Sequence, residues 1–162
     1  MSSMRDTMAT EDRYAAPFFA KIPVSFERGE GVWAFDEDGR RYLDLTAGWG
    51  VTCLGHAHPV ITQALCEQAG KIIQNPNSGA SYSPARARLL ALMKEILPAH
   101  LERVFFQNSG AEANDAAIKL ARKASGRPTV VSTYMSFHGR TISTASATGQ
   151  ESHRGRYNPL MP

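Results

Sequence analysis

Apolar residues along the chain recur at two spacings, which predict helices in some stretches and strands in others. Over residues 58–73 they lie three or four positions apart with polar residues opposite, and Pro59 suits the first turn of a helix. A second helix is predicted over 84–96, with Ser83 as its N-cap, and a third over 111–125. The third has a stripe of mostly small residues suited to close packing on a sheet: Ala113, Ala116, Ala117, Leu120, Ala121 and Ala124.

Shorter β-prone runs lie between these helices. Two of them flank an Asp-Gly turn within 32–45 and predict a hairpin. Apolar runs at 103–107 and 129–133 are of strand length, and 141–148 has the composition of a weaker strand. A strand, a helix and a strand in this order imply a right-handed crossover and a parallel sheet, so the predicted fold class is α/β. Residues 75–82 are rich in Asn, Pro, Ser and Gly and predict a loop.

Composition narrows the class of protein. The chain has 162 residues, of which 43% are hydrophobic and 20% charged, so it is near one ordinary domain in length and long enough to bury a core. Its formal charge of +3 is spread without a basic run, so no nucleic-acid partner is expected. No apolar stretch is long enough to span a bilayer, and the polar stretch 1–11 has no signal core. Cys53 and Cys66 stand alone, which is typical of a protein from the reducing cytoplasm. Together with the absence of an apolar span, this predicts a cytoplasmic protein without membrane contact.

The stretch around residues 104–114 is the first candidate for chemistry, because a strand-like run turns directly into a helix. There Ser109, Gly110 and Ala111 would present backbone N–H groups at the positive end of the helix dipole, and glycine allows an anion to come close. This pattern predicts a phosphate cradle. It lacks the lysine of a P-loop and the three glycines of a dinucleotide fingerprint, and a plain strand-to-helix turn is the alternative interpretation.

A second candidate follows at Ser136–Thr141. The aromatic ring of Phe137 could stack on a flat cofactor, and the guanidinium of Arg140 could hold a carboxylate through two hydrogen bonds. The alternative is a capped loop with an exposed arginine. His56 and His58 have the spacing of a metal pair only superficially, and we interpret them as the turn that leads into a helix, without a metal.

Four stretches in register resemble one known family. Asn-Ser-Gly-Ala-Glu-Ala-Asn at 108–114 and Phe-His-Gly-Arg-Thr at 137–141 resemble the class III aminotransferases, which are pyridoxal-phosphate (PLP) enzymes of fold type I. The upstream segments 31–45 and 54–59 are similar to the same family in the same order. The resemblance runs from about Glu27 to Pro162 and is greatest to the acetylornithine and ornithine aminotransferase branch.

The resemblance implies a partial fold type I structure, with an N-terminal hairpin and helices followed by the first strands of the large-domain sheet. Residues 1–26 would then be a flexible N-terminal tail, because the stretch 1–11 also lacks a periodic apolar pattern. Residues 27–74 would belong to the small domain, and 75–162 would begin the large PLP-binding domain.

The resemblance also implies roles for single residues. The backbone of 109–111 would hold the PLP phosphate, Phe137 would stack on the pyridine ring, and Arg140 would receive a substrate carboxylate. Trp49 falls where the family lines the substrate entrance, although a buried core tryptophan fits the sequence equally well. For His138 we expect packing under the cofactor loop.

The family's reaction would transfer an amino group from an ω-amino or diamino acid, such as acetylornithine or ornithine, to 2-oxoglutarate in a homodimer. The lysine that bonds to PLP, and the acid that pairs with the pyridinium nitrogen, lie downstream of these motifs in the family. The resemblance therefore implies that the catalytic residues are outside this chain, that none of its five lysines bonds to PLP and that the isolated chain is inactive. A PLP aminomutase-type relative and a non-catalytic binding module are the alternatives.

Overall fold

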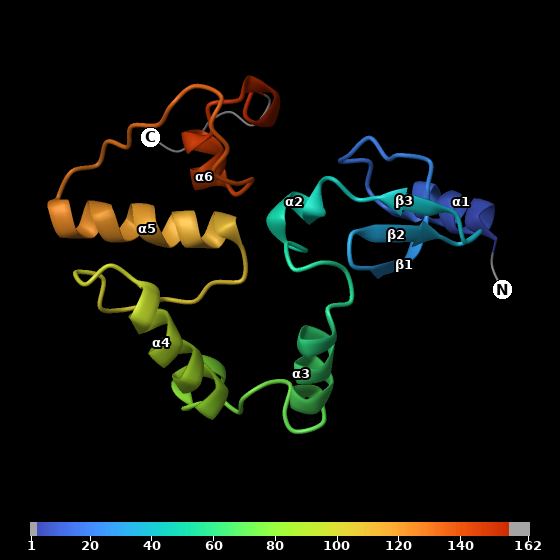
Figure 1. Cartoon of the computed structure of the whole chain (residues 1–162). Helices are drawn as coiled ribbons and strands as arrows, with labels where there is room; N and C mark the ends of the chain where they lie inside the picture. Colours follow the sequence, from blue (N-terminus) through green and yellow to red (C-terminus); the bar gives the residue numbers. More distant parts are fainter. Residues whose placement is uncertain (1–2, 156–162) are drawn as a thin grey trace. The chain divides into compact units, whose positions relative to one another are not determined.

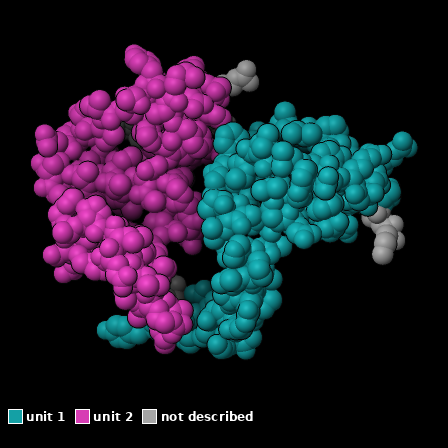
Figure 2. Space-filling model, in the orientation of Figure 1, with its two compact units in different colours: residues 1–83 teal, residues 84–162 magenta. Residues whose placement is uncertain are grey.

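The computed structural model describes residues 3–155, and Figure 1 traces their helices and strands along the chain. The chain divides into two compact units, 1–83 and 84–162, coloured separately in Figure 2. The division falls after the loop predicted for 75–82, and the assignment of 27–74 and 75–162 to a small and a large domain stays a prediction. Within the described residues, none of the helices has the length and apolar character needed to cross a membrane. The sequence Tyr-Asn-Pro-Leu-Met before Pro162 predicts a loop, but residues 156–162 are outside the described residues.

The first unit begins with a helix that hydrophobic periodicity did not predict. Helix α1 spans Met4–Tyr14 and starts with a capping box, in which the Ser3 hydroxyl accepts from the Asp6 amide and the Asp6 carboxylate accepts from the Ser3 amide. None of its residues is buried. The apolar pattern could not predict this helix, because it is marked by its cap and has no buried apolar face. The flexible tail expected over 1–26 stays a prediction.

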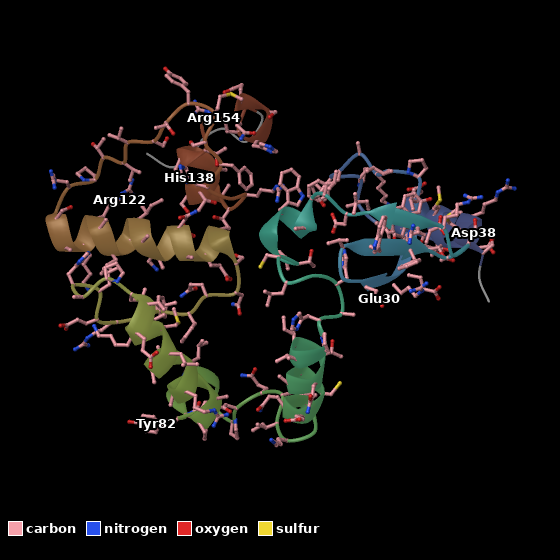
Figure 3. The ribbon with its side chains drawn as sticks, viewed as in Figure 1. Glu30, Asp38, Tyr82, Arg122, His138 and Arg154 are labelled. Carbon is pink, nitrogen blue, oxygen red and sulfur yellow. The ribbon has the colours of Figure 1, made fainter. Side chains whose placement is uncertain are left out.

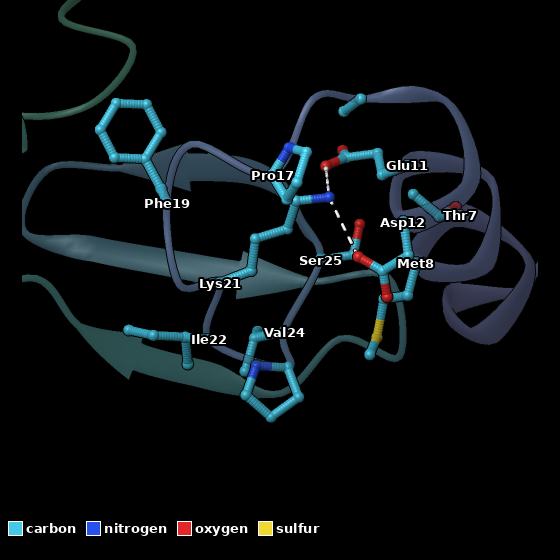
Figure 4. A pocket seen from close by; sticks show the side chains of 12 residues that line it. Thr7, Met8, Glu11, Asp12, Pro17, Phe19, Lys21, Ile22, Val24 and Ser25 are labelled. Atoms are coloured by element: carbon cyan, nitrogen blue, oxygen red, sulfur yellow. Dashed lines mark hydrogen bonds and ion pairs between the residues drawn. The ribbon is translucent and has the colours of Figure 1, made fainter. Parts of the chain in front are cut away.

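Segment 15–25 folds back on α1 and is joined to it by charge. The Lys21 ammonium lies 3.2 Å from a Glu11 carboxylate oxygen and 3.1 Å from one of Asp12. Figure 4 shows Lys21 between these two acids, in a pocket that also has Phe19 and Ile22 in its wall. All three charged side chains are exposed, so solvent screens their attraction and we assign them little stability.

A three-stranded antiparallel sheet follows, in the order β1-β2-β3. Strand β1 is Phe26–Glu30, β2 is Trp33–Asp36 and β3 is Arg41–Leu43. Strands β2 and β3 confirm the hairpin predicted within 32–45. The alternation of residues did not predict β1, whose polar sequence Phe-Glu-Arg-Gly-Glu leaves four of five positions exposed.

Asp36 holds the turn of this hairpin together. Its side chain is 2% exposed, and its two carboxylate oxygens accept from the Arg40 amide and the Tyr42 hydroxyl, each at 2.8 Å. Burial raises the pKa of Asp36, but these donors outweigh it, so the pKa lies below its ordinary value. The hydrogen bonds of the buried Asp36 carboxylate therefore hold the end of the hairpin.

The rest of the first unit is a chain of short elements. The segment α2, Ala47–Gly50, is a left-handed turn, and α3, Pro59–Ala69, confirms the helix predicted within 58–73. A single 3₁₀ turn, Ser78–Ala80, lies in the stretch predicted as a loop.

The second unit is helical. Helix α4 spans Pro84–Ile96 and α5 spans Gly110–Ser125, as the apolar spacing predicted. Gly126 ends α5 in the left-handed conformation, with φ 70°, and its amide donates to the Arg122 carbonyl. A short helix α6, Ile142–Ala147, packs against α5, and a 3₁₀ turn follows at Glu151–His153.

The strands predicted for this unit are not formed. Residues 103–107 and 129–133 pair with no strand in the described chain, and 141–148 contains helix α6 instead. The parallel sheet predicted from them is therefore wrong for the described residues. A strand needs a neighbour for its backbone N–H and C=O groups, which β propensity alone does not supply. At 141–148 a reciprocal cap between Thr141 and Thr144 starts a helix.

Apolar side chains are mostly exposed, contrary to the core that chain length led us to expect. Ala145 is the one apolar residue that counts as buried in the described part of the chain. Phe105 is 78% exposed, Val131 90% and Leu120 68%. These are residues of the unpaired apolar runs and of the small-residue stripe, so the surfaces that would pack on a sheet lie open.

Replacing Asp36 should destabilise the hairpin. In D36A the Tyr42 hydroxyl and the Arg40 amide lose their acceptor, and an unsatisfied buried donor costs free energy. We expect a lower denaturant midpoint, followed by Trp33 fluorescence in a Trp49→Phe background. The control is D38A in the same turn, where the side chain is 52% exposed, and its midpoint should not change. Equal midpoints for the two variants would contradict the role of Asp36.

Candidate functional site

A cavity of about 510 Å³ in the second unit gathers both motifs of the candidate site. It is formed by the start of α5 and by the segment that leads into α6. Its lining residues are Ser109, Gly110, Ala111, Asn114, Phe137, His138, Gly139, Arg140 and Thr141. Two stretches that are separate in sequence thus meet at one cavity, as the resemblance implied.

The start of α5 has the features of an anion-binding helix end. Ser109 is the N-cap, and its hydroxyl accepts from the Glu112 amide at 3.2 Å, while Glu112 accepts from the Asn108 amide at 2.8 Å. The amides of Gly110 and Ala111 stand in the first turn, where a helix offers them no carbonyl partner. A Cβ built on Gly110 would meet nothing within 4 Å, so the backbone there is open to a bound group.

Gly139 brings the second motif onto the first. It is buried, with φ 136°, and a Cβ at this position would lie 2.6 Å from both Ala111 Cβ and Thr144 Oγ1. Only glycine allows so close an approach to the first turn of α5. The Asn114 amide side chain donates to the His138 carbonyl at 2.7 Å and joins the same two segments.

Buried threonines of the α6 segment hold the loop around Gly139 by hydrogen bonds. The His138 amide donates to Thr148 Oγ1 at 3.1 Å, and Thr148 and Thr144 are both 0% exposed. Figure 3 labels His138 beside α6, and the packing of its ring under the loop stays a prediction. The sequence did not single out Asn114, Gly139 or these threonines. Asn114 and Gly139 lie inside the two predicted motifs, but their contacts with His138 and Ala111 join residues 24 or more positions apart and are tertiary features.

Phe137 and Arg140 stand at the same cavity. The guanidinium carbon of Arg140 lies 5.0 Å from the centroid of the Phe137 ring, which is within cation–π range. The Phe137 ring also contacts the His153 ring edge-on, with centroids 5.2 Å apart. Phe137 is 44% exposed, so an aromatic surface and a cation are presented together.

Trp49 belongs to the first unit, whereas all the residues that line this cavity belong to the second. Its side chain is 99% exposed, so the alternative of a buried core tryptophan is wrong for the chain as described. It sits in the left-handed turn α2, with φ 60°. Nothing in the cavity wall tests its expected place at the substrate entrance, which stays a prediction.

The two histidines form a turn before a helix, as predicted. His58 is the N-cap residue of α3, and His56 forms an isolated β-bridge with Gly31. The His56 ring nitrogen Nε2 lies 2.8 Å from Asp44 Oδ2. The Thr46 hydroxyl and amide, then His56, lower the pKa of Asp44 to about 2. Across residues 3–155, no group of three or more His, Cys, Asp or Glu side chains could hold a metal ion.

The family model for aminotransferase class-III matches residues 14–162, which is most of the chain and includes the whole cavity. The chain belongs to the class III aminotransferases. It is an N-terminal portion of such an enzyme with a partial fold type I structure, as the four sequence stretches predicted.

Relatives and solved structures agree with this assignment. The acetylornithine aminotransferase of Gloeobacter violaceus is 46% identical over 152 residues, covering 89% of this chain and 36% of that protein. That of Methanothermobacter thermautotrophicus is 40% identical, covering 93% and 37%. The ornithine aminotransferase structure from Toxoplasma gondii has a TM-score of 0.89 at 28% identity, covering 100% of this chain and 39% of that one.

An ω-transaminase from Thermomicrobium roseum, described as (S)-enantioselective, gives the same TM-score of 0.89 at 30% identity. The chain therefore spans less than half the length of the curated relatives and solved structures that it matches. The family uses PLP.

Substituting Gly139 should separate the two motifs. In G139A the new methyl group would collide with Ala111 and Thr144, and the left-handed φ adds strain. We expect the second unit to lose more than about 1 kcal/mol of stability, measured by chemical denaturation. The matched control is G110A, whose methyl group meets open space. If G139A unfolds at the control's midpoint, the close approach of the loop to α5 is not what holds the site.

Proposed function

We propose that this chain is the cofactor-binding N-terminal part of a transaminase. The enzyme moves an amino group from an ω-amino or diamino acid, of the acetylornithine or ornithine type, to 2-oxoglutarate. The observation that carries the proposal is the meeting of the α5 amides, Phe137 and Arg140 at one cavity. The names of the two relatives reported above, both acetylornithine aminotransferases, support the choice of substrate class.

The residues present fit the phosphate of PLP. The amides of Gly110 and Ala111 open a helix of 16 residues, and its dipole favours an anion at this end. The Ser109 hydroxyl adds a polar group beside them, although it already caps the Glu112 amide. When bound, PLP supplies an electron-accepting ring and an aldehyde for amino-group transfer.

Phe137 and Arg140, at the same cavity, would orient a flat group and an anionic group. Phe137 offers a partly exposed ring on which an aromatic cofactor can stack, and Arg140 offers a planar fork of donors that suits a carboxylate. An arginine beside the cofactor residues favours a transaminase over an aminomutase-type relative. Trp49, on its exposed turn, would line the substrate entrance in the assembled enzyme.

Catalysis itself needs the rest of the enzyme. None of the lysines of the described chain lines the cavity, so no side chain there can form the covalent bond to PLP. The exposed runs at 103–107 and 129–133 would pair with further strands of the large-domain sheet. We place the whole enzyme in the cytoplasm as a homodimer, in keeping with the free thiols of Cys53 and Cys66.

The 162-residue chain alone should not turn over amino donors. With PLP and ornithine or acetylornithine it should give no 2-oxoglutarate-dependent product, and borohydride should fix no PLP on it. The control is a full-length acetylornithine aminotransferase treated in the same way. Borohydride-fixed PLP on a lysine of this chain, together with turnover, would overturn the proposal that catalysis lies elsewhere.

Removing one amide from the cradle should weaken phosphate binding without unfolding α5. G110P deletes the Gly110 N–H, and proline is well tolerated at the first position of a helix. Ser109 has φ −148° and ψ 161°, which suits a residue before proline. A hydrogen bond to a charged group contributes roughly 1.5–3 kcal/mol, so affinity should fall about tenfold or more.

The measurement is a PLP titration of the chain followed through the amide resonance of Ala111. G110A keeps the amide and should bind as the parent does, and pyridoxal, which lacks the phosphate, should cause no shift in the parent. Equal PLP affinities for G110P and G110A would mean that the phosphate does not sit on this amide.

A further inference from the structure

We propose that Asp44 and His56 are positioning residues that clip the left-handed Trp49 turn onto the hairpin. The clip is a property of the first unit and stands without the proposed function. Only the use of Trp49 toward a substrate rests on that function.

The turn that needs holding has an unfavourable backbone. Ala47 has φ 47° and Trp49 has φ 60°, and between them Gly48 has φ 55°. L-residues rarely adopt this region, and two of them so close together persist only where their surroundings fix them. The Trp49 side chain is 99% exposed and cannot do so by packing.

Asp44 fixes the beginning of the turn. Its Oδ1 accepts from the Thr46 amide and hydroxyl, each at 2.8 Å, and from the Ala47 amide at 3.0 Å. Its own amide donates to the Val32 carbonyl at 2.9 Å, which ties the residue to the hairpin. One carboxylate oxygen thus gathers three donors of the turn, and the side chain is only 15% exposed.

His56 fixes the far end of the same loop. Its amide donates to the Gly31 carbonyl at 2.7 Å, and its carbonyl accepts from the Gly31 amide at 3.1 Å. Its ring lies against β1, where a Cβ on Gly29 would come within 2.6 Å of His56 Cγ. The ring then reaches Asp44 Oδ2 at 2.8 Å, so both ends of loop 45–57 meet on one carboxylate.

The geometry leaves the rest of the turn dependent on this closure. Inside it, the Trp49 amide donates to the Thr46 carbonyl at 3.0 Å and the Thr52 amide to the Ala47 carbonyl at 2.9 Å. These bonds survive only while 46 and 47 are held in place. The His56 side chain, which closes the loop on Asp44, therefore fixes the backbone conformation at Trp49.

Amide hydrogen exchange of the 162-residue chain tests the clip. In H56A the amides of Ala47, Trp49 and Thr52 should exchange about tenfold faster or more, because the loop loses a hydrogen bond to a charged group. The amides of the β1–β2 ladder should keep their protection. H56Q, whose side-chain amide nitrogen reaches about as far as Nε2, should restore most of the protection.

The matched control is H58A, two residues further on, where the ring nitrogen Nδ1 is buried without a hydrogen-bond partner. Its exchange at the three turn amides should equal that of the parent. The clip is overturned if H56A leaves these amides protected, if H56Q exchanges as fast as H56A, or if H58A exposes them equally. No PLP or substrate enters this measurement, so a failure of the proposed function would leave its result unaffected.

Discussion

The close approach of Gly139 to the first turn of α5 is the contact on which the candidate site depends. Without it, the helix start at 109–111 and the pair Phe137 and Arg140 would not line one cavity. The missing side chain lets the loop backbone reach Ala111, and the Asn114 hydrogen bond to the His138 carbonyl keeps it there. A helix end that favours anions therefore gains an aromatic ring and a cation at the same opening.

Polar groups stabilise both units where an apolar core would normally do so. Asp36, Thr144 and Thr148 are the most buried side chains described, and each is hydrogen-bonded within its own unit. The larger apolar residues lie outside, on the unpaired runs and along α5. Such exposure is expected for a portion of a larger fold, because the strands and helices that complete it supply the missing contacts.

The dependence of some elements on missing neighbours also explains which elements the sequence predicted correctly. The backbone hydrogen bonds of helices α3, α4 and α5 lie within each helix, so the spacing of apolar residues was sufficient to predict them. The β2–β3 hairpin was predicted because its turn lies between the two strands in the sequence. The strands predicted at 103–107 and 129–133 depend on neighbours that the described residues do not supply. Helices α1 and α6 start with reciprocal caps between the N-cap residue and the residue three positions on. Neither helix shows a broad apolar stripe, so the spacing of apolar residues could not predict them.

For the site, the residue types and order of four stretches were sufficient to indicate the family, because a chance match of all four in register is improbable. The supporting residues could not be found in this way. Gly139 and Asn114 matter through a contact 24 or more residues apart, and Asp44 matters through a loop closed by His56. In both cases the contacts that fix the local geometry lie inside one unit. The start of α5 and the Trp49 turn are therefore each shaped without any contact from the other unit.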